Sequence, residues 1–185
     1  ADLTHDRTAA WFTDVEGDVW RLDDGAPPRV SPALQGQRAH HIAVAGDGSV
    51  LGITRDDDIV CYGIGAESRA VDLGHRTTLR HDARRINDLA LSRDGGLIAA
   101  GLGNGSAILW RRSDGARLAV LRGHDRRVSA VQFSRDDHTL VTASWDGSAR
   151  LWSLRQLTRS AESLSSELQA EWGLSVRDAL QQSRR

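Results

Sequence analysis

The sequence has one cysteine, no methionine and no lysine among its 185 residues. The single cysteine, Cys61, excludes an internal disulfide framework and a zinc site built from cysteines. Long hydrophobic runs are also missing: none approaches the roughly 18 apolar residues of a membrane span, and the N-terminus lacks the apolar core of a secretory signal. We therefore expect a cytoplasmic location and no membrane partner. We interpret the absence of lysine as codon bias of a GC-rich, bacterial gene.

Neither sign of charge is in excess, because 24 basic side chains stand against 25 acidic ones and the formal net charge is −1. A nearly neutral chain has no bulk attraction to nucleic acid. A nucleic-acid partner is therefore disfavoured. Apolar residues make up 39% of the chain, which is enough to build a core.

The sequence does contain an internal repeat. Four segments carry an Asp or Asn six residues before an aromatic residue: Asp14 and Trp20, Asp56 and Tyr62, Asn104 and Trp110, Asp146 and Trp152. The aromatic residues are 42, 48 and 42 positions apart. Short alternating runs broken by turns that contain Asp or Gly precede them, as in antiparallel strands. Four strands in about 42 residues match one propeller blade, so we predict an all-β fold.

The segment GHDRRVSAVQFSRDDHTLVTASWDGSARLWSL, residues 123–154, resembles a WD40 repeat. The resemblance covers residues 1–154, strongly in the last two repeats and weakly in the first two, and implies about four blades of a β-propeller that form a partial ring. It also implies a hydrogen-bonded structural tetrad of His124, Thr142, Asp146 and Trp152. Such a network is physically reasonable, because a buried carboxylate, imidazole and indole N–H are each costly when unpaired.

The other repeats retain parts of this tetrad. The third has His81, Asn104 and Trp110, with Ala100 at the position of the hydroxyl. The second has Asp56 and Tyr62, and the first has Asp14 and Trp20. We interpret all of these residues as determinants of the fold and none as catalytic.

Aligning the repeats gives an incomplete first blade at 1–31, a second at 32–79, a third at 80–121 and a fourth at 122–154 without its outer strand. In the first blade we expect strands at Ala9–Thr13 and Asp18–Leu22, and Leu3 aligns with Phe133, so the chain starts inside an innermost strand. Rings of the WD40 family usually have about seven blades. We expect a fragment of a longer protein whose remaining blades come from an upstream fragment or a second chain. Joining of two copies and closure of the fragment on itself are alternatives.

Residues 155–185 differ in composition from the repeats. Leu157, Leu164, Leu168 and Trp172 have helical spacing, and Gly173 stands where a helix would end. We predict a short C-terminal α-helical tail. It either packs on its own propeller, or docks a partner or covers the unpaired blade edge.

One surface signal recurs across the repeats: Arg38, Arg85 and Arg127 each stand immediately before an innermost strand. The family resemblance places this position on the top face of the ring, together with the residue before the turn Asp, which includes Arg55 and Trp145. Our hypothesis is that these five residues bind an acidic protein segment or a phosphate-bearing ligand, because guanidinium groups suit carboxylates and phosphates. The alternative is that each Arg pairs with a nearby Asp, such as Asp57, Asp82 or Asp125, and only solubilises the loops.

Catalytic and metal-binding motifs are missing. There is no G-x-S-x-G elbow and no H-E-x-x-H helix, and the glycine-rich residues 101–106 coincide with a strand turn. His40 and His41 are adjacent, so on a strand they point to opposite faces and do not readily ligate one ion. We expect no metal, no cofactor and no enzyme activity in this chain.

We favour a noncatalytic protein-interaction or scaffold module. By fold analogy it is the C-terminal sensor or regulatory propeller segment of a larger bacterial signalling or defence-type protein. The alternative is part of a multidomain enzyme, an NTPase, kinase or protease, whose active site lies outside this chain.

Overall fold

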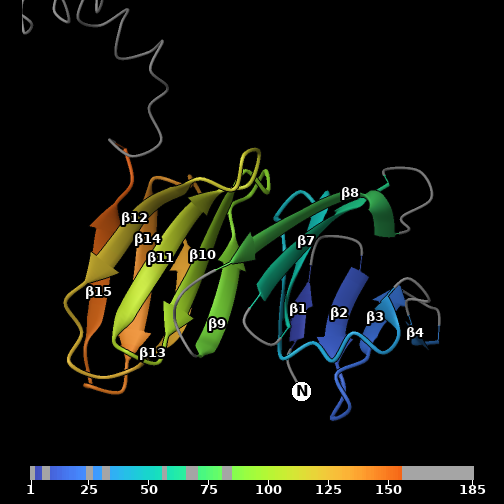
Figure 1. Ribbon diagram of the computed structural model, residues 1–185, viewed down its shortest axis with the longest axis horizontal. Helices are drawn as coiled ribbons and strands as arrows, with labels where there is room; N and C mark the ends of the chain where they lie inside the picture. The colour runs from blue at the N-terminus through green and yellow to red at the C-terminus, as the bar shows by residue number, and fades with distance from the viewer. Residues whose placement is uncertain are drawn as a thin grey trace, which may run out of the picture. The chain divides into compact units, whose positions relative to one another are not determined.

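A computed structural model describes residues 3–5, 9–23, 27–30, 34–55, 58–65, 71–80 and 85–155. These residues form fifteen strands in four antiparallel sheets and no α-helix (Figure 1). The predicted all-β fold is therefore confirmed. The predicted helical tail lies outside the described residues after Arg155.

Each sheet is built from strands that follow one another in the sequence. Sheet 1 contains β1 (Leu3–His5), β2 (Ala9–Thr13), β3 (Val19–Asp23) and β4 (Arg29–Val30). Sheet 2 contains β5 (His41–Val44), β6 (Val50–Arg55), β7 (Asp58–Ile64) and β8 (Val71–Arg80). Sheet 3 contains β9 (Ile86–Leu91), β10 (Leu97–Leu102), β11 (Ser106–Arg111) and β12 (Arg117–Arg122). Sheet 4 contains only β13 (Val128–Phe133), β14 (Thr139–Ser144) and β15 (Ala149–Ser153).

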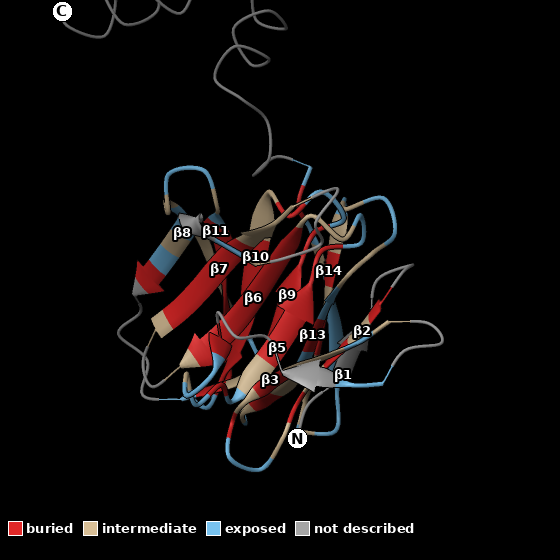
Figure 2. Ribbon diagram, turned by 90° about the vertical axis from the view of Figure 1, so that its right-hand side faces the viewer, coloured by how far each residue is buried: buried red, intermediate tan, exposed pale blue. Residues whose placement is uncertain are grey.

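Consecutive sheets pack through the first strand of the later one. β5 contacts β1 and β2, β9 contacts β5 and β6, and β13 contacts β9, β10 and β11. We define the forward face of a sheet as the face toward the next sheet in chain order, and the backward face as the one toward the preceding sheet. Figure 2 shows that β5, β6, β9 and β10 of the two central sheets are largely buried.

The apolar pattern of each strand follows from this packing. β10 reads LIAAGL and is buried over nearly its whole length, because both faces of sheet 3 are covered. β2 of sheet 1 alternates between buried and half-buried side chains, because only its forward face packs on another described sheet. Trp11 of β2 contributes to the core between sheets 1 and 2 with Leu51 and Ile53. Cys61, Leu89 and Ile98 lie in the core between sheets 2 and 3.

Polar contacts also join sheet 3 to sheet 4. The side-chain amide of Asn87 donates to the carbonyl of Val128 at 2.9 Å, and a carboxylate oxygen of Asp88 accepts the backbone N–H of Val131 at 2.7 Å. Both bonds run from β9 to β13. They set how the innermost strands of the two sheets lie against each other.

The loop between β12 and β13, which enters sheet 4, lies directly against the β10–β11 turn of sheet 3. Gly105 in that turn has φ +83°, and a β-carbon built on it would lie 2.4 Å from the carbonyl oxygen of His124. Only glycine has both the left-handed backbone and the missing side chain that this approach requires. The β10–β11 turn is therefore part of the contact between sheets 3 and 4.

Candidate functional site

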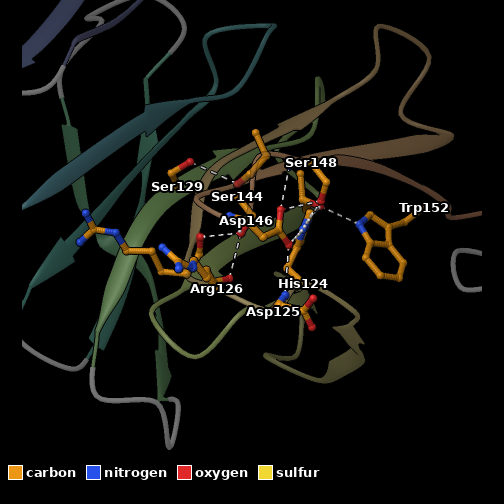
Figure 3. Close-up of polar contacts among 11 residues, drawn as sticks. His124, Asp125, Arg126, Ser129, Ser144, Asp146, Ser148 and Trp152 are labelled. Atoms are coloured by element: carbon orange, nitrogen blue, oxygen red, sulfur yellow. Dashed lines mark hydrogen bonds and ion pairs between the residues drawn. The ribbon is translucent and has the colours of Figure 1, made fainter.

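His124, Asp146 and Trp152 of the expected tetrad lie together (Figure 3), and Thr142 of β14 is hydrogen-bonded to His124 and Trp152. Nδ1 of His124 is 2.9 Å from Oδ2 of Asp146, and Nε2 of His124 is 2.8 Å from Oγ1 of Thr142. The indole N–H of Trp152 donates to the same Thr142 oxygen at 2.9 Å. One chain of hydrogen bonds thus links the loop before β13 to β14, β15 and the turn between them.

The chemistry of these groups fixes the direction of each bond. Asp146 accepts, so Nδ1 of His124 carries the proton and Nε2 is the acceptor. Thr142 then donates its hydroxyl proton to Nε2 and accepts the N–H of Trp152. Thr142 is fully buried, so its one hydroxyl serves both His124 and Trp152.

Asp146 is anchored from a second side by Ser148. The backbone N–H and hydroxyl of Ser148 donate to Oδ1 at 2.8 and 2.6 Å, and the backbone N–H of Asp125 donates to Oδ2 at 3.1 Å (Figure 3). These donors, with the Ser148 hydroxyl the largest influence, hold the pKa of Asp146 well below its ordinary value. Asp146 is therefore an anionic anchor of the turn.

Sheet 3 keeps only part of this arrangement. Oδ1 of Asn104 accepts the backbone N–H and hydroxyl of Ser106 at 3.1 and 2.6 Å, as Asp146 does with Ser148. Trp110 is buried, and Ala100 has no hydroxyl that could link the Trp110 indole to Asn104. His81, the other expected member of this network, lies outside the described residues.

Sheet 2 has Tyr62 at the corresponding position on β7. Its side chain is only 2% exposed, and burial raises the pKa of its phenol. Asp56, the other expected member of this repeat, lies outside the described residues.

Sheet 1 departs from the alignment expected from the sequence. In sheet 4 the turn Trp145–Gly147 is closed by the backbone N–H of Ser144 donating to the carbonyl of Ser148 at 3.1 Å. In sheet 1 the same bond runs from Asp14 to Asp18 at 3.1 Å, around the turn Val15–Gly17. Asp14 thus corresponds to Ser144, two residues away from the position of Asp146.

The same shift holds along the strands. Leu3 pairs with Phe12 as Val131 pairs with Thr142, so the expected alignment of Leu3 with Phe133 is wrong by two residues. Asp14 and Trp20 still meet, but directly: the indole N–H donates to Oδ2 of Asp14 at 2.8 Å. This bond is the largest cause of the lowered pKa of Asp14. Sheet 1 therefore links an Asp to a Trp without a His or a Thr between them.

Of the five residues expected to bind a partner, the structure brings Arg127 and Trp145 together. Cζ of Arg127 lies 3.1 Å from the centroid of the Trp145 ring, and the indole side chain is 61% exposed. The backbone N–H of Trp145 donates to the carbonyl of Arg127 at 3.1 Å. Gly103 donates in the same way to Arg85 at 3.0 Å, so the two arginines occupy the same position in sheets 3 and 4.

The remaining arginines of this set differ in their surroundings. Arg38 and Arg85 are exposed. Arg55 is half-buried and donates from Nη1 to the side-chain oxygen of Gln37 at 2.6 Å. Within the described residues no ion pair joins Arg127 to Asp125, while Asp57 and Asp82 lie outside them.

The family model described as "WD domain, G-beta repeat" matches residues 74–111 and 115–153. The chain contains WD40 repeats. Each match starts at or in the outermost strand of one sheet and ends with the third strand of the next, so a WD40 repeat here ties two neighbouring sheets together. No curated protein matches the chain. WD40 repeats indicate a protein-interaction or scaffold module, and domains of this kind are generally noncatalytic.

The described residues of this WD40 protein contain no group of three or more His, Cys, Asp or Glu side chains placed to hold a metal ion. They also contain no helix with the length and apolar character needed to cross a membrane. Cys61 is fully buried, and burial raises the pKa of its thiol to about 12. The thiol is thus inert at neutral pH.

Sequence reasoning missed two features of these WD40 sheets. Ser148 completes the anchoring of Asp146, and its signal was the serine that stands two residues after the turn residue in both D-G-S and N-G-S. The second is Asp137, whose carboxylate accepts the backbone N–H of Arg93 from the neighbouring sheet. No motif marks that contact, because it depends on how two sheets lie against each other.

Proposed function

We propose that this chain is a noncatalytic protein-interaction module whose contact surface centres on Trp145 and Arg127. The observation that carries the proposal is the stack of the Arg127 guanidinium, 3.1 Å from the ring centroid of an indole that is 61% exposed. Trp and Arg dominate the energetics of protein interfaces, because each combines a large contact area with a hydrogen-bonding or charged group.

The pair is held rigidly by its own backbone. The hydroxyl of Ser144 donates to the carbonyls of Arg126 and Arg127, both at 2.9 Å, and accepts the backbone N–H of Asp146 at 3.1 Å. Together with the bond from Trp145 to Arg127, these contacts fix the turn against the loop that enters sheet 4. A preordered surface loses little conformational entropy when a partner binds.

The exposure of Trp145 does not come from sheet 4 being the last described sheet. Val15 in sheet 1 and Gly103 in sheet 3 occupy the same turn position and are also exposed, although another sheet follows each of them. This turn position therefore faces away from the contact between sheets. An indole there is available to a partner.

The arginines favour an acidic protein segment as that partner. Arg85 repeats the position of Arg127 on the neighbouring sheet, and neither forms an ion pair within the described residues. Guanidinium groups bind carboxylates in a bidentate way, so a Glu-rich or Asp-rich segment suits these positions. A phosphate-bearing ligand has related chemistry, whereas the net charge of −1 disfavours nucleic acid.

We propose further that the module acts in the cytoplasm as the C-terminal sensor or regulatory segment of a larger bacterial signalling or defence-type protein. Further blades of the propeller would come from upstream sequence or a second chain. The backward face of sheet 1 and the forward face of sheet 4, which pack on no other described sheet, support that idea. In the alternative, the larger protein is an NTPase, kinase or protease whose active site lies elsewhere.

The experiment measures the affinity of the full chain for a fluorescently labelled Glu-rich peptide by anisotropy. The double variant Arg85→Ser, Arg127→Ser is expected to bind roughly tenfold more weakly at an unchanged melting temperature. Arg135→Ser is the matched control, because Arg135 is an exposed arginine in the turn at the other end of β14. Equal affinities for the double variant, the control and the wild type would count against the site. Displacement of the labelled peptide at a much lower concentration of a phosphopeptide than of the unlabelled Glu-rich peptide would replace the acidic segment with a phosphate-bearing ligand.

A further inference from the structure

Arg85 and Arg127 occupy the same position in neighbouring sheets but differ in what covers them. The Trp145 indole lies on the Arg127 guanidinium, and Arg127 is half-buried. Arg85 is exposed, and no aromatic ring of the described residues lies on its guanidinium. One turn residue accounts for the difference, because sheet 3 has Gly103 where sheet 4 has Trp145.

The backbone around the two arginines is the same. The N–H of Gly103 donates to the carbonyl of Arg85 at 3.0 Å, and that of Trp145 donates to the carbonyl of Arg127 at 3.1 Å. A glycine with φ +83° stands two residues after Gly103 and two residues after Trp145. A side chain at position 103 would therefore leave the backbone in the direction that brings the Trp145 indole onto Arg127.

Neither the backbone conformation nor a lack of space requires glycine at position 103. Gly103 does not have a positive φ. A β-carbon built on it would lie 3.6 Å from Cβ of Arg85 and 4.0 Å from Nδ2 of Asn87, and these are ordinary van der Waals distances. The consequence of glycine here is that the turn of sheet 3 leaves the face of the Arg85 guanidinium uncovered.

The surroundings of Gly103 are fixed by hydrogen bonds. The side-chain amide of Asn87 donates to the carbonyl of Val128 at 2.9 Å, so the amide that borders position 103 is held in place. Gly103 and Asn104 are themselves exposed. An aromatic ring that approaches from solvent therefore meets a preordered surface, which limits the conformational entropy lost on binding.

We propose that the acidic partner segment carries an aromatic side chain that stacks on Arg85 beside Gly103, in the place that Trp145 takes on Arg127. This inference rests on the proposed function, because the same segment supplies carboxylates to the arginines. A guanidinium that stacks on a ring keeps its in-plane N–H donors for a carboxylate. An aromatic residue beside an acidic one thus satisfies both the face and the edge of Arg85. The preference for an aromatic residue belongs to Arg85 alone, because Arg127 already has a ring of its own.

The test compares two labelled Glu-rich peptides that differ only at the central residue, which is phenylalanine in one and cyclohexylalanine in the other. Both side chains are apolar and similar in size, but only phenylalanine has a π-system. By anisotropy, the full wild-type chain is expected to bind the phenylalanine peptide at least roughly threefold more tightly. Arg85→Ser is expected to weaken both peptides and to abolish this preference. Arg127→Ser is expected to weaken both peptides and to keep it.

Gly103→Trp covers Arg85 from within the chain and is expected to abolish the preference at an unchanged melting temperature. Val15→Trp is the matched control, because it adds an indole at the same turn position of sheet 1, and it is expected to keep the preference. If Gly103→Trp melts early, Arg85→Ser decides the matter. Equal wild-type affinities for the two peptides, or a preference that survives in Arg85→Ser, would overturn the aromatic contact and leave the proposed function standing. Failure to bind either peptide would overturn the proposed function and this inference with it.

Discussion

The carboxylate of Asp137 accepts the backbone N–H of Arg93 at 3.0 and 3.1 Å, and so connects the β13–β14 turn of sheet 4 to the corresponding turn of sheet 3. Asp137 has φ +57°, in the left-handed region where sheets 2 and 3 place Gly48 and Gly95. An aspartate in this conformation costs about 1 kcal/mol relative to glycine. The hydrogen bonds to Arg93 offset that strain.

The first prediction separates these two contributions. Asp137→Ala keeps the strained backbone and loses the acceptor, so we expect the free energy of unfolding to fall by about 1–2 kcal/mol. Asp137→Gly also loses the acceptor but relieves the strain, so its free energy of unfolding is expected to be about 1 kcal/mol higher than that of the alanine variant. Urea denaturation of the two variants measures the difference. Equal stabilities would show that the backbone at position 137 is not strained.

The second prediction compares two glycines in the same turn position. Gly105 and Gly147 both have φ +83°, so alanine imposes a similar backbone strain of about 1 kcal/mol at each. Only at Gly105 would the new methyl group also lie 2.4 Å from the carbonyl oxygen of His124. We expect Gly105→Ala to lower the melting temperature clearly more than Gly147→Ala. Equal losses would mean that the turn does not press on the loop entering sheet 4.

The third prediction concerns the hydroxyl shared by His124 and Trp152. Thr142→Val keeps the shape of the side chain but leaves Nε2 of His124 without a donor and the indole N–H without an acceptor. Each buried group left unpaired costs about 1–3 kcal/mol. The His124 side chain is buried and Trp152 is half-buried, so we expect a loss of at least about 1 kcal/mol. Thr139→Val on the same strand is the control, because the Thr139 side chain lies outside the network. Calorimetry of both variants tests the difference, and similar losses would argue against the shared hydroxyl.

The fourth prediction is a pH dependence that belongs to Asp146. Its folded pKa lies below the ordinary value of 3.8, mainly because Ser148 donates hydrogen bonds to the carboxylate. The stability that this group contributes is therefore fully present above pH 3.8 and is lost as the pH falls toward the folded pKa. Asp146→Asn lacks a titrating group, as does the natural Asn104. We expect the difference in unfolding free energy between wild type and Asp146→Asn to shrink as the pH is lowered below that value. A difference that stays constant as the pH falls well below 3.8 would contradict the role of the charge.

The sequence predicted most of the strands and the composition of the sheet 4 network. The repeat placed a strand at Ala9–Thr13, where β2 lies, because alternation and turn residues are local signals. The predicted alignment was wrong in sheet 1, because Asp14 and Trp20 have the same six-residue spacing as Asp146 and Trp152 but occupy different positions in the sheet. Spacing along the chain does not reveal which residues close a turn. The informative signal was glycine, which directly follows Asn104 and Asp146 but stands three residues after Asp14.

The contacts between sheets were beyond prediction. Asp137 is one of several acidic turn residues, and nothing in the sequence singles it out as the one that reaches Arg93. The stack of Arg127 on Trp145 was predicted only as proximity on one face. Its geometry depends on Ser144, which holds the turn to the loop through the carbonyls of Arg126 and Arg127.

The most direct test of the proposed contact surface is the indole N–H resonance of Trp145 in the full chain. The resonance is identified among the six tryptophans by its loss in Trp145→Phe, and is followed while a Glu-rich peptide is added. We predict that it shifts progressively, that the indole resonance of the buried Trp110 does not, and that Arg127→Ser reduces the shift at every peptide concentration. A bound peptide that leaves the Trp145 resonance unmoved would contradict the account.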